Sequence, residues 1–133
     1  ILDMIERYSR EEMASIWKLE NKFSYYLDVE LAVVKAQVEL GNFPKEAYEI
    51  IKNSAKFDIK RIDEIEKITR HDVIAFLENV NENVSKEYSP YIHKGLTSSD
   101  VIDTAFALQI KDASKIIIED IEKEVVSFLN SHF

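Results

Sequence analysis

The sequence contains no cysteine, which excludes disulfide bonds and thiolate metal sites. It has only two glycines and two prolines in 133 residues, so turns are few and the secondary-structure elements are expected to be long. No apolar run approaches the roughly 20 residues that span a bilayer, and no signal-peptide pattern is found. These absences favour a soluble protein of the cytoplasm.

Clustered positive charge is also missing. Asp and Glu outnumber Lys and Arg by 25 to 17, which gives a formal net charge of −8 and a pI of about 4.9. A surface this acidic repels nucleic acids and anionic lipids, so neither is expected as a partner. The three histidines, His71, His93 and His132, have no spacing typical of a metal site.

Helical periodicity is what the chain does have, and no strand-like alternation accompanies it. The hydrophobic fraction of 46% is ample for a core. One long helical face is formed by residues that recur every three or four positions, namely Phe23, Leu27, Leu31, Val34 and Val38. Gly41 supplies the left-handed residue that ends this helix. The pattern predicts an all-α fold.

Polar residues predict where other helices begin. Ser9 and Glu12 fit a capping box for a short helix that ends near Trp17. Pro44 suits the first position of another helix. Asp58 and Ser98 are candidate N-caps for two more.

Two features predict the interruptions that follow. The first polar cluster, Thr69–Asp72, divides or joins two helical patterns, and Ser89-Pro90 ends the pattern that continues through Val84.

No helix-breaking residue occurs after Ser98. Residues 101–118 are apolar on nearly all sides, as in a helix buried within a bundle or between subunits. A narrower seam typical of a bundle then follows, formed by Ile117, Ile121, Val125 and Phe128.

The first polar cluster combines three groups suited to an anionic ligand. Arg70 offers a forked, permanently charged donor, His71 can move a proton near neutral pH, and Asp72 can orient the ring or accept from a hydroxyl. The alternative is a solvated helix junction, which is the more frequent situation for such residues.

The second polar cluster, His93–Asp100, precedes the last helix. Gly95 permits close approach of the backbone, while Thr97 and Ser98 carry short hydroxyls that can bind a carboxylate at a helix N-terminus. An ordinary N-cap explains Ser98 and Asp100 but leaves His93, Gly95 and Thr97 unexplained.

A third feature, Arg7-Tyr8, has the groups to grip a phosphate. Its alternative is a hydrophobic staple, with Tyr8 packed before the Ser9 cap.

Together these motifs resemble the adenylosuccinate lyase family of the fumarase/aspartase superfamily. The resemblance extends from Met4 onward. It rests on Met-Ile-x-Arg-Tyr at residues 4–8, on Thr-Arg-His-Asp-Val at 69–73, and on His-x-Gly-Leu-Thr-Ser-x-Asp-Val at 93–101. Related lyases carry other patterns at the first polar cluster; argininosuccinate lyase would show a Ser-Arg-Asn-Asp type sequence there.

The resemblance implies a fold, a reaction and an assembly. Such enzymes are helical homotetramers that eliminate fumarate from adenylosuccinate, giving AMP, and from the succinylated carboxamide ribotide of purine biosynthesis. They need no cofactor and no metal, and their active sites lie where three subunits meet. The implied partners are therefore a nucleotide, a dicarboxylate and further copies of the chain.

The resemblance also implies roles for individual residues. Arg7 and Tyr8 would hold the nucleotide phosphate. Arg70, His71 and Asp72 would contact the nucleotide, with His71 as the catalytic residue close to the reacting centre. His93 would be a second substrate-contacting histidine. Thr97 and Ser98 would hold the succinyl carboxylates.

The family's general acid and base would lie beyond Phe133. Residues 1–111 are then expected to form the N-terminal helical domain, with 1–3 foreign to the natural chain, and residues 112–133 the start of the central bundle. We expect this part alone to be inactive. Two alternatives stay open: a non-catalytic helical interaction module, and a related succinyl-type lyase with another substrate.

Overall fold

The computed structural model describes residues 6–132, and within this range every regular element is helical. The expected all-α fold is therefore confirmed. Two short 3-10 turns accompany six α-helices. In chain order the elements are η1 (Glu6–Tyr8), α1 (Glu11–Ile16), α2 (Leu19–Glu39), α3 (Ala47–Ser54), α4 (Ile59–Thr69), α5 (Asp72–Asn81), η2 (Ser89–Tyr91) and α6 (Ser98–His132).

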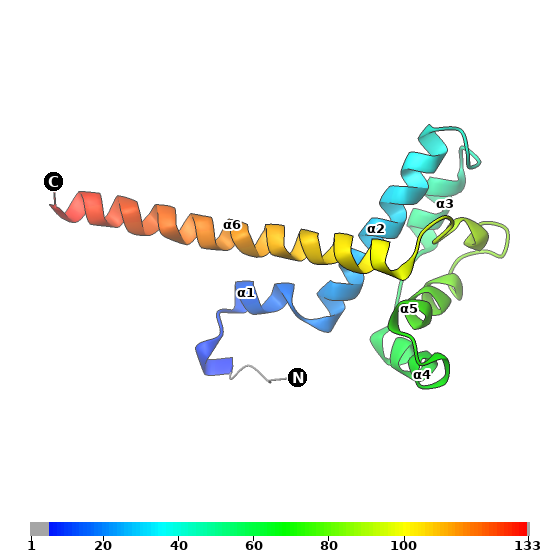
Figure 1. Ribbon diagram of the computed structural model, residues 1–133, viewed down its shortest axis with the longest axis horizontal. Coiled ribbons are helices and arrows are strands. Elements are labelled where there is room, and N and C mark those ends of the chain that lie inside the picture. The colour runs from blue at the N-terminus through cyan, green and yellow to red at the C-terminus, as the bar shows by residue number, and fades with distance from the viewer. Residues whose placement is uncertain (1–5, 133) are drawn as a thin grey trace.

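The helices form a small packed body from which α6 projects (Figure 1). α2 packs against the first half of α6 and against α3, while α4 and α5 form a pair. α1 lies beside α6 and also contacts α2. This arrangement leaves the end of α6 without a partner among the described helices.

Stacked aromatic rings fill the centre of the packed body. Phe23 of α2 stacks on Phe76 of α5, with ring centroids 5.5 Å apart and planes within 1° of parallel. Tyr26 meets both rings edge-on, each at 5.7 Å. Both phenylalanines and Tyr26 are buried. Because such rings bury a large apolar area, they fix how α2 sits on the α4–α5 pair.

One predicted helix end and one predicted helix start are confirmed. Gly41 follows α2 with a φ of 77°, the left-handed conformation expected of a residue that ends a helix. Asp58 caps α4, its Oδ1 accepting a hydrogen bond of 2.9 Å from the Arg61 N–H.

Two predicted helix starts are wrong by a few residues. α1 has Arg10, not Ser9, at its N-cap position, one residue after the predicted cap. The Arg10 side chain makes no cap and instead pairs with Glu12 and with Asp120 of α6. Pro44 does not open α3; its carbonyl accepts from Ala47 N–H, and this turn precedes the helix.

Two further boundaries differ from the sequence prediction. α5 ends at Asn81, before Ser89-Pro90, because Asn83 donates to the carbonyls of Asn79 and Lys56 and draws the chain into a turn. Val84 is buried although it lies outside the helix. Hydrophobic spacing alone does not separate a buried loop residue from a helical one.

α6 is 35 residues long, and only one stripe of its first half is buried, formed by Val101, Ala105, Gln109 and Ala113. Within this stripe the Gln109 side chain donates a 3.0 Å hydrogen bond to the Ile16 carbonyl and so closes the end of α1. The sequence predicts a helix buried within a bundle or between subunits, but on the described chain the other apolar side chains of α6 are exposed: Phe106, Ile110, Ile117, Ile118, Ile121, Val125, Val126, Phe128 and Leu129.

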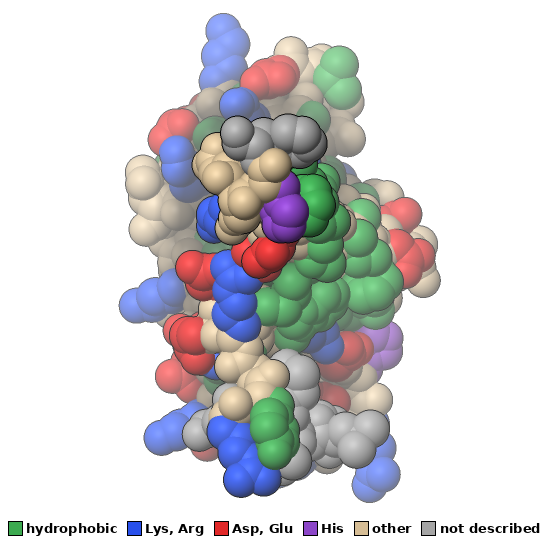
Figure 2. Space-filling model, turned by 90° about the vertical axis from the view of Figure 1, so that its left-hand side faces the viewer, with side chains coloured by type: hydrophobic (Ala, Val, Ile, Leu, Met, Phe, Trp, Pro, Cys, Tyr) green, Lys and Arg blue, Asp and Glu red, His purple; other side chains and the backbone are tan. Residues whose placement is uncertain are grey.

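Hydrophobic side chains gather on one side of the face from which α6 projects, as Figure 2 shows. No helix within residues 6–132 is long and apolar enough to cross a membrane.

Candidate active site

The first polar cluster forms the sharp turn between α4 and α5. Arg70 ends α4 in the left-handed conformation, with a φ of 54°. His71 returns to extended backbone and caps α5, its Nδ1 accepting a 3.3 Å hydrogen bond from the Ile74 N–H. Since Nδ1 is the acceptor, the neutral ring carries its proton on Nε2 and offers that group as a donor.

A hollow of about 430 Å³ lies beside this turn, between α2 and α4. Arg70, His71 and Asp72 all line it, so the structure brings these three predicted residues together. Asp72 is held by the Val73 N–H at 2.8 Å from Oδ1 and by Lys22 of α2, whose Nζ lies 3.6 Å from Oδ2.

The charges around this hollow are mixed. Arg70 and Lys22 are cationic, whereas Asp63 and Glu66 of α4 are acidic. Within the part of the chain that the structure describes, Arg70 makes no ion pair. Its exposed guanidinium is thus available to an anionic ligand.

Lys22 is a lining residue that the sequence analysis missed. Its ammonium group lies 5.3 Å from the Tyr26 ring centroid as well as beside Asp72. The pKa of Tyr26 is raised by burial, while Lys22 opposes that shift. Sequence offers no signal for this role, because 50 positions separate Lys22 from Asp72 and only the packing of α2 brings them together.

The second polar cluster forms a structured turn before α6. His93 and Gly95 both have left-handed backbones, with φ values of 61° and 85°. Thr97 caps α6: its N–H donates to Asp100 Oδ2 at 2.7 Å, and its hydroxyl also lies 3.0 Å from that oxygen. Asp100 N–H in turn approaches the Thr97 hydroxyl at 3.4 Å, which completes a reciprocal cap.

The predicted cap at Ser98 is therefore wrong by one residue. Ser98 is the first residue of α6 and is half-buried. Hydrogen bonds from Thr97 lower the pKa of the Asp100 carboxyl, and the nearby His93 adds to the shift. His93, Thr97 and Asp100 thus form one polar group at the start of α6.

A buried carboxylate on α2 anchors His93. Glu30 is 2% exposed, and its Oε2 accepts the His93 backbone N–H at 2.8 Å while its Oε1 lies 2.6 Å from His93 Nδ1. Burial raises the pKa of Glu30, and the bonds from His93 oppose that shift. Sequence analysis missed Glu30, although a charged residue in helical register with buried Tyr26 and Val34 was a readable signal.

Arg7 and Tyr8 lie on η1, apart from both polar clusters (Figure 1). Tyr8 is 76% exposed, so the hydrophobic staple is not formed. The Arg7 guanidinium instead sits 4.7 Å from the centroid of the Tyr8 ring. Met4, Ile5 and the residues before them lie outside the described range.

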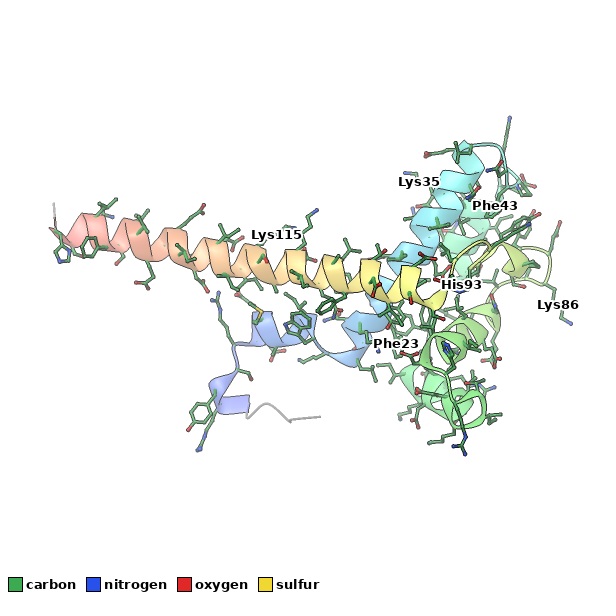
Figure 3. All side chains as sticks on the ribbon, viewed as in Figure 1. Phe23, Lys35, Phe43, Lys86, His93 and Lys115 are labelled. Carbon is green, nitrogen blue, oxygen red and sulfur yellow. The ribbon has the colours of Figure 1, made fainter. Side chains whose placement is uncertain are left out.

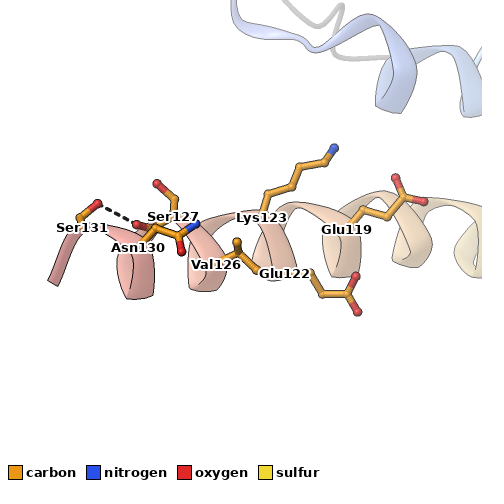
Figure 4. Close-up of a pocket in the computed structure, with 7 residues that line it drawn as sticks. All are labelled: Glu119, Glu122, Lys123, Val126, Ser127, Asn130 and Ser131. Carbon is orange, nitrogen blue, oxygen red and sulfur yellow. Dashed lines mark hydrogen bonds between the residues drawn. The ribbon is translucent and has the colours of Figure 1, made fainter. Parts of the chain in front are cut away.

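The hollow beside the first polar cluster is lined by no residue of the second. An apolar hollow of about 650 Å³ between α2 and α6 is lined by Gly95 and Asp100 but not by Arg70 or His71. A hollow of about 700 Å³ along the end of α6 is lined by that helix alone (Figure 4). It has no facing wall that could enclose a ligand.

Comparisons with known proteins give the family. A family model described as "Lyase" matches residues 6–132. The chain belongs to this lyase family.

No group of three or more acidic or histidine side chains in the described ranges is arranged to hold a metal ion.

Individual members of the lyase family are similar over most of the chain. The chain is 55% identical over 120 residues to adenylosuccinate lyase of Synechocystis sp. (strain ATCC 27184 / PCC 6803 / Kazusa), covering 90% of this chain and 28% of that protein. It is 49% identical over 122 residues to adenylosuccinate lyase of Bacillus subtilis (strain 168), covering 92% of this chain and 28% of that protein.

A solved structure has a similar fold over most of this chain. The crystal structure of fumarate lyase from Mesorhizobium sp. BNC1 superposes with a TM-score of 0.76 at 25% identity, covering 86% of this chain and 29% of that one. The chain therefore spans little more than a quarter of the length of the proteins it matches.

Proposed function

We propose that the complete polypeptide containing these residues eliminates fumarate from adenylosuccinate, giving AMP, and acts in the same way on the succinylated carboxamide ribotide. The observation that carries this proposal is the 55% identity to a named adenylosuccinate lyase across 90% of the chain. The same segment contains both polar clusters, each placed at the start of a helix.

The described residues would supply the binding half of such a site. Arg70 and Asp72 are proposed to contact the nucleotide, with His71 next to the reacting centre. His93 is proposed as a second substrate contact, and Thr97 with Ser98 as the holder of the succinyl carboxylates. Arg7 and Tyr8 would hold the phosphate. Because η1 lies apart from both clusters, this last role requires neighbouring copies of the chain.

These residue types suit a β-elimination that releases a dicarboxylate. A base removes the proton beside a carboxylate, the carbon–nitrogen bond breaks, and an acid protonates the leaving nitrogen. Negative charge that develops on the carboxylate needs donors around it, which hydroxyls and backbone N–H groups at the start of α6 can provide. The base and the general acid are proposed to lie outside this chain.

Assembly is part of the proposal. The exposed apolar side chains of α6 include Ile117, Ile121, Val125 and Phe128, which is a seam suited to a helical bundle. We propose that residues 112–133 begin this bundle, that residues 1–111 form the domain before it, and that a homotetramer in the cytoplasm results.

The test is the change in absorbance when adenylosuccinate is converted. The complete polypeptide should give fumarate and AMP in equal amounts, whereas the 133-residue chain alone should give no turnover. Failure of the complete polypeptide to cleave adenylosuccinate would overturn the substrate assignment. Cleavage of another succinylated amine in its place would identify a related lyase.

A further inference from the structure

The side chain of Glu30 holds His93 from the core. Figure 3 shows His93 near the beginning of α6, where the preceding loop meets the packed helices. Glu30 reaches it from α2 with both carboxylate oxygens, one on the backbone N–H at 2.8 Å and one on ring Nδ1 at 2.6 Å. The carboxylate is 2% exposed, so solvent has little access to its oxygens.

The backbone of His93 is in a conformation that an ordinary residue avoids. Its φ of 61° lies in the left-handed region, which is costly for a residue with a side chain. The bond from His93 N–H to Glu30 Oε2 opposes that cost. Glu30 therefore orients the peptide and the ring together, and a change at Glu30 should disturb both.

The ring contact also selects a tautomer. An ionised carboxylate only accepts hydrogen bonds, so His93 Nδ1 must carry the proton. Nε2 then holds the lone pair of the neutral ring, and within residues 6–132 it makes no hydrogen bond. His71 has the opposite arrangement, because its Nδ1 accepts from Ile74 N–H. The two histidines thus present Nε2 atoms of opposite hydrogen-bonding character.

We propose that Glu30 is a positioning residue that holds His93 in the Nδ1–H form and directs its unprotonated Nε2 toward the substrate. This inference rests on the proposed function only in assigning the substrate as the partner of Nε2. A neutral Nε2 accepts a hydrogen bond, so the group it meets is a donor such as a hydroxyl, an amino group or a protonated acid, and not a bare phosphate oxygen.

The tautomer is measurable without any assay of activity. The protein contains three histidines, so a two-bond 1H–15N spectrum of 15N-histidine-labelled protein shows few signals. Assignment uses the His71→Gln and His132→Gln variants. At a pH about two units above the usual histidine pKa of about 6.5, His93 should show a protonated Nδ1 and an unprotonated Nε2. A His93 with Nε2–H, or with rapid exchange between both forms, would overturn the proposal.

Glu30→Gln provides the second test, because it preserves volume. The amide oxygen can still accept from His93 N–H, but the amide nitrogen then donates to Nδ1 and forces the proton onto Nε2. The spectrum should change to the opposite tautomer, while circular dichroism should show an unchanged helix content. Glu39→Gln, an exposed glutamate of the same helix, is the matched control and should leave the spectrum as it is. An Nδ1–H signal that persists in Glu30→Gln would show that Glu30 does not select the tautomer.

The same variants in the complete polypeptide separate this inference from the proposed function. Glu30→Gln should lower kcat/KM roughly 10- to 100-fold. Removal of the hydrogen-bonding partner that orients a metal-ligating histidine has an effect of this size, and Glu30 orients His93 in the same way. Glu30→Asp, which keeps the charge, should recover part of that loss. Full activity in Glu30→Gln would refute the positioning role, whereas an inactive wild type with the expected tautomer would refute only the substrate assignment.

Discussion

The hydroxyl of Tyr25 donates a 2.7 Å hydrogen bond to Asp112 and so joins α2 to α6 across 87 positions of the chain. Burial, followed by this bond, raises the pKa of Tyr25 to about 12. The same bond, with help from Lys115, lowers the pKa of Asp112. This contact ties the projecting helix to the packed body just before the buried stripe of α6 ends at Ala113.

Tyr25→Phe should therefore change stability in a pH-dependent way. The raised pKa means that the neutral phenol stabilises the folded state fully below about pH 10, and that this contribution disappears as the pH rises to about 12. At neutral pH the variant should lose about 1 kcal/mol. Urea unfolding of both proteins at several pH values should show the difference between them shrinking above pH 10. A constant difference would contradict the assignment.

His71→Asn and His71→Ala should separate the capping role of His71 from its proposed chemical role. Asparagine is a good N-cap, so His71→Asn should keep stability close to that of the wild type, whereas His71→Ala should lose up to about 1 kcal/mol. Both changes remove the imidazole. In the complete polypeptide both should lower kcat by about 10²- to 10³-fold, as expected for loss of a hydrogen-bond donor next to the reacting centre. Near-normal kcat in His71→Asn would leave His71 with a structural role only.

Asp58→Ala should destabilise the protein by about 1 kcal/mol, because the Arg61 N–H loses its 2.9 Å partner at the start of α4. Asp58→Asn keeps an accepting oxygen and serves as the control. Thermal unfolding followed by circular dichroism measures both. Equal melting temperatures for Asp58→Ala and wild type would show that the cap contributes nothing.

Gly41→Ala and Gly95→Ala should each cost about 1 kcal/mol through backbone conformation alone. Both glycines have a positive φ, and a Cβ added at either would meet no atom within 4 Å. The two changes should therefore have similar effects on urea unfolding. They should differ in activity of the complete polypeptide, since only Gly95 lies in the second polar cluster. A loss of activity in Gly41→Ala as large as in Gly95→Ala would indicate a general effect of destabilisation.

The sequence predicted most of the fold because local rules govern most of it. The cap of Asp58 and the left-handed Gly41 depend only on neighbours in the chain. On the predicted face of α2, Phe23 and Val34 are fully buried, whereas Leu27, Leu31 and Val38 are only partly buried. The boundaries that moved depend on contacts made elsewhere. Arg10 is drawn toward Asp120 of α6, and Asn83 bonds to the carbonyl of Lys56.

The candidate site was predictable only in part for the same reason. Arg70, His71 and Asp72 are adjacent in sequence, so their shared hollow follows from one turn. From α2, Lys22 contacts the first polar cluster and Glu30 contacts the second. Neither residue belongs to a sequence motif that would predict this contact. A glutamate inside an apolar helical face was nevertheless a usable clue, because a buried carboxylate needs a partner.

The number of residues in α6 determines the direction in which its distal apolar side chains point relative to its anchored first half. Its 35 residues rise over roughly 52 Å, and one helical residue corresponds to a rotation of about 100°. Removing a single residue after Ala113 would therefore turn the distal apolar side chains away from their present direction, while the anchored half stayed in place. Removing about seven residues, or two turns, would shorten the helix but restore the direction. Variation in the length of this segment should consequently occur in whole turns.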